Sequence, residues 1–230
     1  MSGAKRASHQ GQPVLRSGVP LEDARAAVIL VHGRGATAEG ILQLVPLLAV
    51  TDVAFLAPQA AGNEWYPFPF LAPLEMNEPW LGSALQFLGD LLAEVAAAGI
   101  PRQHTALVGF SQGACLTLEY VARNAKRYGA VVALSGGLIG PDSLRRDYTG
   151  SLEGTPVFLG CSDSDPHIPL SRLHLSAGVM RELGGNVDLR IYPGMGHTIN
   201  EDEIAAARTL LERARMPARS YWERLSEWRG

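Results

Sequence analysis

Residues 109–113 place a serine in a setting that could make its hydroxyl reactive. They read Gly-Phe-Ser-Gln-Gly and match the G-x-S-x-G pattern, with Ser111 at the centre. An apolar run ends at Val108 and a helical pattern begins at Gly113, which is the strand–turn–helix context that the pattern requires. Glycines at both ends let the strand and the helix approach each other, so that the serine stands above the sheet as a nucleophile. The plainer alternative is a serine that only caps the helix.

A serine hydroxyl is a weak nucleophile unless a base removes its proton. His197 is the best candidate among the six histidines, because it lies in a glycine-flanked loop directly after an apolar strand and before the last predicted helix. His167 and His174 are the alternatives, and His174 fits the surface of a helix. We therefore predict that His197 is the general base.

Two carboxylates could orient the imidazole of such a base. Asp163 and Asp165 share the loop that follows the apolar run Pro156–Leu159. Aspartates also stabilise turns by bonding to their own backbone, so one of them can serve the turn while the other serves the histidine. The order serine, aspartate, histidine along the chain is that of the α/β-hydrolase fold and differs from the other two common serine-hydrolase orders.

A fourth element, His32-Gly33-Arg34-Gly35, follows the first strong strand. Backbone N–H groups in such a loop can complete an oxyanion hole with the N–H of the residue after the nucleophile. We predict that the two donors are the N–H groups of Arg34 and Gln112. Taken alone, the sequence also fits a plain glycine-rich turn, and it lacks the other residues of a dinucleotide fingerprint or a P-loop.

Strand and helix patterns alternate along the chain, which predicts an α/β fold with a mostly parallel sheet and helices on both faces. The site is expected at the carboxyl ends of the strands. Most of the apolar runs are continuous, as in strands buried on both faces, whereas the last one alternates and is predicted nearer an edge. The predicted strands are Ala27–Val31, Val53–Ala57, Thr105–Val108, Ala130–Leu134, Pro156–Leu159 and Val187–Tyr192. The predicted helices are Ala38–Leu48, Glu78–Ala98, Gly113–Ala125, Ser171–Leu183 and Glu201–Ala214, the last with a capping box formed by Asn200 and Glu203.

Residues 60–79 do not fit the alternation, because their prolines exclude a helix and their aromatic residues are unusual for a solvated loop. The segment is either packed on its own side chains or covers the active site as an acyl-binding wall.

Arg34 has two possible roles. Its guanidinium could bind a substrate carboxylate in the active-site pocket, or pair with Glu75, Glu78 or another surface acid. The candidate substrate-binding residues are Arg34, Trp65, Tyr66, Phe68, Glu75, Met76 and Trp80.

The composition narrows the class of protein. The 230 residues are 47% hydrophobic and 19% charged with a net charge of −3, which excludes a disordered chain and gives no sign of a nucleic-acid binder. The sequence shows neither a secretory signal nor an apolar run near the roughly 18 residues of a membrane-spanning helix. The two cysteines, Cys115 and Cys161, indicate neither a disulfide framework nor a zinc site.

We therefore expect a cytoplasmic protein with a single α/β-hydrolase domain over residues 1–215, flexible at 1–13. A tail or helix of unknown role follows at residues 216–230. Its apolar residues at helical spacing are Tyr221, Trp222, Leu225 and Trp228.

From about Ala27 to Arg213 the sequence resembles the phospholipase/carboxylesterase family of α/β-hydrolases, which includes bacterial carboxylesterases and acyl-protein thioesterases. The resemblance implies a triad of Ser111, Asp165 and His197, because the family's acid is the aspartate that a proline follows. It also implies an enzyme without cofactor or metal, cytoplasmic in bacteria and often a homodimer. Arg34 and Ala36 depart from it, since the thioesterases usually carry leucine and aspartate there. The motifs that carry the resemblance are His32-Gly33-Arg34-Gly35, Gly109-Phe110-Ser111-Gln112-Gly113, Asp165-Pro166-His167-Ile168-Pro169 and Gly194-Met195-Gly196-His197.

These observations predict a serine hydrolase that cleaves small-molecule carboxylic esters of small or medium acyl groups through an acyl-enzyme. A thioesterase or a lysophospholipase would use the same triad. Arg34 as a carboxylate binder would instead indicate an enzyme similar to the dienelactone hydrolases, and peroxide could replace water at the acyl-enzyme. A non-catalytic binding module of the same fold would lack a triad or oxyanion residue, and none is missing from this sequence.

Overall fold

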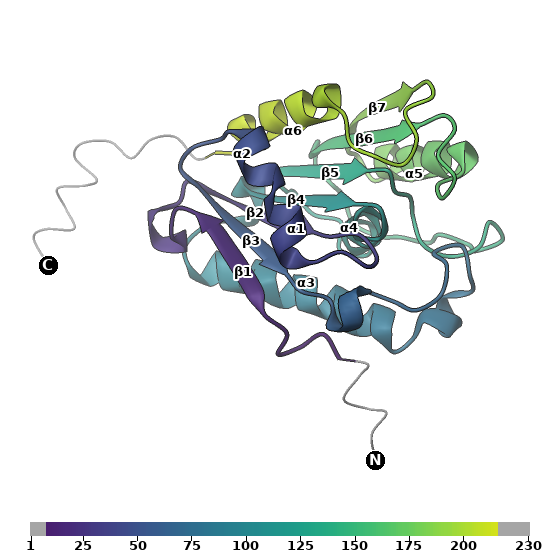
Figure 1. Ribbon diagram of the computed structural model, residues 1–230, viewed down its shortest axis with the longest axis horizontal. Helices are drawn as coiled ribbons and strands as arrows, with labels where there is room; N and C mark the ends of the chain where they lie inside the picture. The colour runs from purple at the N-terminus through teal and green to yellow at the C-terminus, as the bar shows by residue number, and fades with distance from the viewer. Residues whose placement is uncertain (1–7, 216–230) are drawn as a thin grey trace, which may run out of the picture.

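A seven-stranded sheet forms the centre of the molecule (Figure 1). The computed structural model describes residues 8–215, so the apolar residues of the predicted tail, Tyr221 to Trp228, lie outside the described residues. The strands stand in the order β1-β3-β2-β4-β5-β6-β7, with β1 antiparallel to β3 and the other pairs parallel. The fold class predicted from the sequence is confirmed. The strands are β1 (Val14–Gly18), β2 (Ala26–Val31), β3 (Val53–Pro58), β4 (Thr105–Phe110), β5 (Ala130–Leu134), β6 (Pro156–Ser162) and β7 (Asn186–Tyr192).

The hydrophobic pattern of each strand follows from its place in the sheet. Every residue of β2, β3 and β5 is buried, because helices cover both faces of these strands. Strand β7 lies at one edge, and its residues alternate largely between exposed and half-buried, in agreement with its alternating sequence. Strand β1, at the other edge, is absent from the strands that the sequence predicts. It is five residues long with no buried residue, so it lacks the apolar run that marks a central strand.

Two layers of helices enclose the sheet. Helices α3 (Trp80–Ala97), α4 (Gln112–Arg123) and α5 (Leu170–Glu182) pack on one face, while α1 (Ala38–Leu42), α2 (Leu44–Leu48) and α6 (Glu201–Ala214) pack on the other (Figure 1). The capping box predicted for α6 is present, with both of its hydrogen bonds formed between Asn200 and Glu203. Short 3₁₀ helices occur at Leu21–Asp23, Ala61–Asn63, Leu74–Asn77 and Arg102–His104.

The single helix predicted over Ala38–Leu48 is instead two short helices, α1 and α2, that meet at Gln43. Pro46 explains the break, because proline has no N–H to donate and its ring clashes with the carbonyl four residues earlier, here that of Leu42. The Gln43 N–H bonds to the carbonyl of Gly40, three residues back, which closes the first helix.

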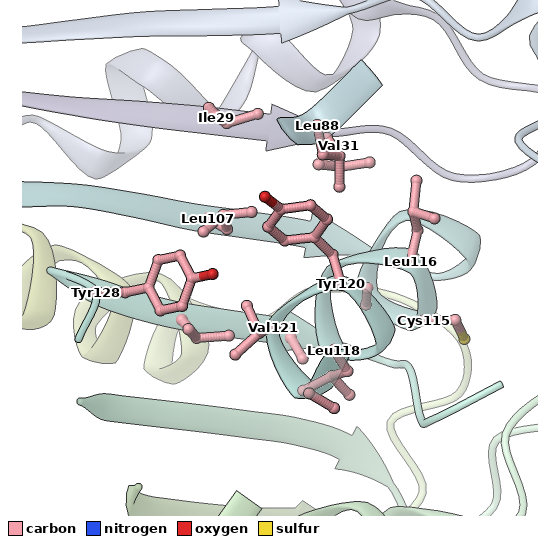
Figure 2. Close-up of a cluster of buried hydrophobic side chains, with 14 of the residues drawn as sticks. Ile29, Val31, Leu88, Leu107, Cys115, Leu116, Leu118, Tyr120, Val121 and Tyr128 are labelled. Atoms are coloured by element: carbon pink, nitrogen blue, oxygen red, sulfur yellow. The ribbon is translucent and has the colours of Figure 1, made fainter. Parts of the chain in front are cut away.

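The larger part of the core lies between the sheet and helices α3, α4 and α5. Figure 2 shows Leu116, Tyr120 and Val121 of α4 beside the strands that carry Ile29, Val31 and Leu107. All residues of α4 from Gln112 to Ala122 are buried, so the helix is enclosed on every side. The residue that precedes α4, Ser111, is therefore held between a buried strand and a buried helix.

Candidate active site

The backbone at Ser111 has the strained conformation predicted for a nucleophile elbow. Its φ and ψ are 55° and −121°, a region that non-glycine residues rarely adopt. The flanking glycines are required by close packing. A Cβ atom at Gly109 would lie 2.4 Å from the carbonyl oxygen of Gly113, and one at Gly113 would lie 2.1 Å from the carbonyl oxygen of Val31. The strand and the helix can therefore meet at this distance only with glycine at both positions.

Three side chains from separate loops meet at this elbow. His197 Nε2 lies 2.8 Å from Ser111 Oγ, and His197 Nδ1 lies 2.7 Å from Asp165 Oδ2. The Asp165 side chain is fully buried, while 17% of the His197 side chain is exposed. The residues follow β4, β6 and β7, so parallel strands bring their carboxyl ends to one edge of the sheet. This arrangement can move a proton from a serine hydroxyl to an imidazole whose orientation a carboxylate holds.

Several donors surround the Asp165 carboxylate. Its Oδ1 accepts the N–H groups of His167 and Ile168, at 2.8 Å and 3.1 Å, and its Oδ2 accepts from His197 and from the Cys161 thiol, 3.6 Å away. Burial works to raise the pKa of the Asp165 carboxyl, but the hydrogen bonds from His197 and the two N–H groups outweigh burial and hold the pKa below its usual value. The carboxylate is thus available as an anion beside the imidazole.

Asp163 has a separate task in the same loop. Its carboxylate accepts the N–H of Gly194 at 2.9 Å, and the hydroxyl of Ser162 accepts the N–H of Gly196 at 3.1 Å. Both bonds join the loop after β6 to the loop that carries His197. Of the two aspartates, Asp165 therefore contacts the imidazole, while Asp163 holds the backbone of the histidine loop.

The backbone of the 33–36 loop approaches the elbow closely. A Cβ atom at Gly33 would lie 3.2 Å from the Cβ atom of Ser111. The N–H of Ala36 bonds to the carbonyl of Gly33, and the N–H of Gly35 bonds to the carbonyl of Asn63. Gln112 is the first residue of α4, so its N–H has no acceptor within the helix. Arg34 and Gln112 both line the same pocket as Ser111.

That pocket has a volume of about 610 Å³ and a predominantly apolar lining. Of the candidate substrate-binding residues, only Arg34 and Tyr66 belong to the lining. Trp65 is completely buried behind it, Phe68 and Met76 are exposed outside it, and Glu75 and Trp80 also lie outside it. The lining consists of Gly33, Arg34, Ala36, Tyr66, Pro67, Pro69, Phe70, Leu71, Phe110, Ser111, Gln112, Cys115, His167, Ile168 and His197.

Sequence reasoning missed several of these residues. Phe110 is recognisable from its place directly before Ser111, and Ile168 from its place in the motif that begins at Asp165. Phe70 and Leu71 carried no such signal, because a proline-rich loop has no period that tells which side chains face inward. His167, the alternative base, forms a T-shaped ring contact with His197 at a centroid distance of 4.7 Å. His174 is exposed on α5, as its pattern predicted.

The Arg34 guanidinium is bound to other groups of the protein. It forms an ion pair with Glu64 at 2.7 Å, a surface acid other than the two named from the sequence, and it donates to the carbonyls of Tyr66, Pro67 and Phe68. These contacts occupy both terminal nitrogens of the fork. They weaken the hypothesis that Arg34 binds a substrate carboxylate.

Trp65 is held behind the pocket by two buried histidines. Its ring lies 5.4 Å from the ring of His9 and 5.0 Å from that of His32, and its Nε1 donates to the carbonyl of His32. His9 accepts the N–H of Ala61, and His32 accepts the N–H of Ala60, so each imidazole offers an unprotonated nitrogen. Burial lowers the pKa of both histidines, which favours the neutral rings that these bonds require. His9 belongs to the segment expected to be flexible, and it is fully buried.

Within residues 8–215, no group of three or more His, Cys, Asp or Glu side chains is arranged to hold a metal ion. The same described residues include no helix that is both long enough and apolar enough to cross a membrane.

The sheet order, the elbow and the Ser111–His197–Asp165 geometry are those of the α/β-hydrolase class. The sequence profile of the family described as Phospholipase/Carboxylesterase matches residues 18–214. The chain therefore belongs to the phospholipase/carboxylesterase family, and it is a hydrolase of the esterase and thioesterase type.

Individual relatives agree with this assignment. A phospholipase/carboxylesterase of Dyadobacter fermentans is 43% identical, with a TM-score of 0.85 over 88% of this chain and 97% of the other. The structure of esterase PE8 is 28% identical, with a TM-score of 0.72 over 88% of this chain and 98% of the other. Acyl-protein thioesterase 1 of Gibberella zeae is 27% identical over 219 residues, which are 84% of this chain and 92% of the relative.

Proposed function

We propose that this protein hydrolyses carboxylic esters with neutral, apolar acyl groups through an acyl-enzyme on Ser111. The observation that carries the proposal is the continuous contact from Asp165 Oδ2 to His197 Nδ1 and from His197 Nε2 to Ser111 Oγ, at 2.7 Å and 2.8 Å. Both distances fall in the range in which protons are exchanged between side chains. The strained backbone at Ser111 supports the same role.

In the first half-reaction, His197 takes the hydroxyl proton as Ser111 Oγ attacks the acyl carbon, and Asp165 stabilises the imidazolium that forms. The carbonyl oxygen becomes an anion, which the N–H groups of Arg34 and Gln112 would bind at the start of α4, where the helix dipole favours negative charge. The imidazolium then gives its proton to the alcohol oxygen as the ester bond breaks. The products are the alcohol and the acyl ester of Ser111.

The second half-reaction repeats these steps with water. His197 removes a proton from water as the water oxygen attacks the acyl carbon, and the same two N–H groups bind the oxyanion. The bond to Ser111 Oγ then breaks, and His197 returns the proton to the serine. The carboxylic acid leaves, and the enzyme is regenerated without any group from outside the chain.

The pocket supports an apolar acyl group. Phe70, Leu71, Phe110 and Ile168 line it, and among the described residues Arg34 is the only Lys or Arg in the lining. The terminal nitrogens of the Arg34 guanidinium are bound to Glu64 and to three backbone carbonyls, so they are not free to form a bidentate contact with a substrate carboxylate. A thioester carbonyl would be attacked in the same way, and relatives named acyl-protein thioesterase make thioesters the second substrate class to test.

The test compares wild type with Ser111→Ala on p-nitrophenyl esters of graded acyl length, one thioester and one carboxylated ester. We expect Ser111→Ala to keep the wild-type melting temperature and to lose at least about 10³-fold in kcat/KM. A fluorophosphonate should label wild type and not the variant. Wild-type activity in Ser111→Ala would refute the nucleophile. A preference for the carboxylated ester would refute the neutral-substrate assignment.

A further inference from the structure

The two residues whose N–H groups are proposed to bind the oxyanion also use their side chains, and both side chains hold the same stretch of chain. We call this stretch, residues 64–68, the wall segment, because Tyr66 and Pro67 line the pocket. We infer that Arg34 and Gln112 are positioning residues whose side chains fix the wall segment relative to the oxyanion donors, so that acyl-group fit and oxyanion stabilisation depend on one another. This inference rests on the proposed function.

Arg34 makes four hydrogen bonds to the wall segment. Nη1 donates to Glu64 Oε2 at 2.7 Å and to the carbonyl of Pro67 at 2.9 Å, and Nη2 donates to the carbonyls of Tyr66 and Phe68 at 2.7 Å and 3.0 Å. A planar fork with donors in fixed directions is required to reach three carbonyls at once. Lysine has a single charged nitrogen and could not reproduce this pattern.

Gln112 also binds the wall segment. Its Oε1 accepts the N–H of Trp65 at 2.9 Å, and its Nε2 donates to the carbonyl of Tyr66 at 2.8 Å. The side chain is buried, so both bonds are shielded from water. The carbonyl oxygen of Tyr66 therefore accepts from Arg34 and from Gln112 together, and through this one atom the two side chains act on the same peptide group.

Two further hydrogen bonds tie the wall segment to the loop that carries Arg34, while His9 and Asn77 hold it from elsewhere in the chain. The Gly35 N–H bonds to the carbonyl of Asn63 at 2.7 Å, directly before the segment, and Trp65 Nε1 bonds to the carbonyl of His32 at 2.8 Å. Both partners, Gly35 and His32, belong to the loop that carries Arg34. A displacement of the wall segment would therefore displace the Arg34 backbone, whose N–H is a proposed oxyanion donor.

This arrangement predicts a defined kinetic signature for Arg34→Leu. A freed wall segment should alter the relative kcat/KM for short and long acyl chains, and displaced oxyanion donors should lower kcat. Misplacement of reacting groups by about 1 Å can cost up to about 10²-fold, so we expect kcat to fall about tenfold or more. Arg34→Lys should recover only part of this loss. Arg16→Leu removes an ion pair with Glu94 that lies outside the pocket lining, and it is the matched control.

A double-mutant cycle tests the dependence directly. Gln112→Met removes both side-chain bonds at similar volume. Because Arg34 and Gln112 share the Tyr66 carbonyl, the double variant Arg34→Leu/Gln112→Met should be about as slow as the slower single variant. If the fold-losses in kcat multiply, the two side chains act independently and the inference is overturned.

Further outcomes separate the inference from the proposed function. If Gln112→Met does not have the wild-type melting temperature, the test uses the Arg34 variants alone. The relative kcat/KM for short and long acyl chains is then compared among Arg34→Leu, Arg34→Lys and Arg16→Leu. If the Arg34 variants give the same profile as Arg16→Leu, the inference is overturned. Ser111→Ala is measured in parallel. An inactive Ser111→Ala with an unaltered Arg34→Leu rejects the coupling only, whereas an active Ser111→Ala rejects the proposed function.

Discussion

At the scale of single residues, the site depends on groups whose surroundings hold them in one chemical state. Ser111 is kept at a φ of 55° by its neighbours, and Asp165 is buried but receives hydrogen bonds at both oxygens. Cys161 adds a donor that is unusual for such a carboxylate. Burial, with a further contribution from the Asp165 carboxylate, raises the pKa of this thiol to about 12, so it remains protonated and can donate at neutral pH.

We predict that Cys161→Ala lowers kcat/KM by about 2–10-fold, because Asp165 loses a donor that helps to hold its Oδ2 toward His197. Cys161→Ser keeps a hydroxyl at nearly the same place and should restore most of the activity. The measurement is steady-state kinetics on one p-nitrophenyl ester, together with the melting temperature of each variant. Equal activities of the alanine and serine variants would show that the thiol only fills space.

At the scale of elements, glycines and polar side chains decide how closely segments approach. Gly113 lets α4 lie against the carbonyl of Val31, and this contact puts the elbow beside the 33–36 loop. Behind the pocket, His9 accepts the N–H of Ala61, His32 accepts the N–H of Ala60, and the two rings pack against the Trp65 ring. These bonds exist only while both imidazoles are neutral.

The folded protein should therefore lose stability as the pH falls below about 6.5. Burial lowers the folded-state pKa of His9 and His32 below the unfolded value of 6.5, so the unfolded chain binds more protons in the window between the two values. Stability then rises with pH across that window, by up to about 1.4 kcal/mol per pH unit for each histidine.

Urea unfolding of wild type and His9→Gln between pH 5 and 8 measures this effect. Glutamine can accept the Ala61 N–H and donate to the Trp65 carbonyl without titrating, so the variant should show a shallower loss below pH 6.5. Above pH 7.5 the two curves should run parallel, which serves as the internal control. Parallel curves over the whole range would contradict the assignment of a neutral, buried His9.

At the scale of the whole molecule, the sheet gathers loops from distant parts of the chain and the two helical layers hold it in place. Helix α6 closes one face, and its Glu203 is completely buried against Gly160 of β6. Burial raises the pKa of this carboxyl to about 7, although the Asn200 N–H bond acts in the opposite direction. Helix α6, which follows His197, therefore packs against the sheet with a buried carboxyl group that is protonated below about pH 7.

The variant Glu203→Gln should become more stable relative to wild type as the pH rises from about 4.5 to 7. In that window the unfolded wild type releases the Glu203 proton while the folded state keeps it, so wild-type stability falls by up to about 1.4 kcal/mol per pH unit. The glutamine amide does not titrate. Differential denaturation at pH 4.5, 6 and 8 measures the difference, which should level off above pH 7. A difference that is independent of pH would contradict a raised pKa for Glu203.

Much of this architecture could be predicted from the sequence because its signals are local. Continuous apolar runs mark the strands that are covered on both faces, and α6 begins and ends where its capping box and apolar spacing indicate. The same holds for the elbow at Ser111, since its glycines are required by the contact between one strand and the next helix. The edge strand β1 and the break at Gln43 lie outside these signals. The strand has no buried run, and the apolar spacing of residues 38–48 continues through Pro46 although the helix does not.

The sequence alone determined which residues could do the chemistry: a serine between two glycines, a histidine after the last strand and a pair of aspartates in one loop. Only the tertiary structure decided which aspartate contacts the imidazole, which side chains of residues 60–79 line the pocket, and that the Arg34 guanidinium binds the wall segment. The physical reason is that a strand or helix imposes a period on its own side chains. The orientation of a side chain in an irregular loop is set by partners far away in the sequence, such as Gln112 for Trp65 and Tyr66.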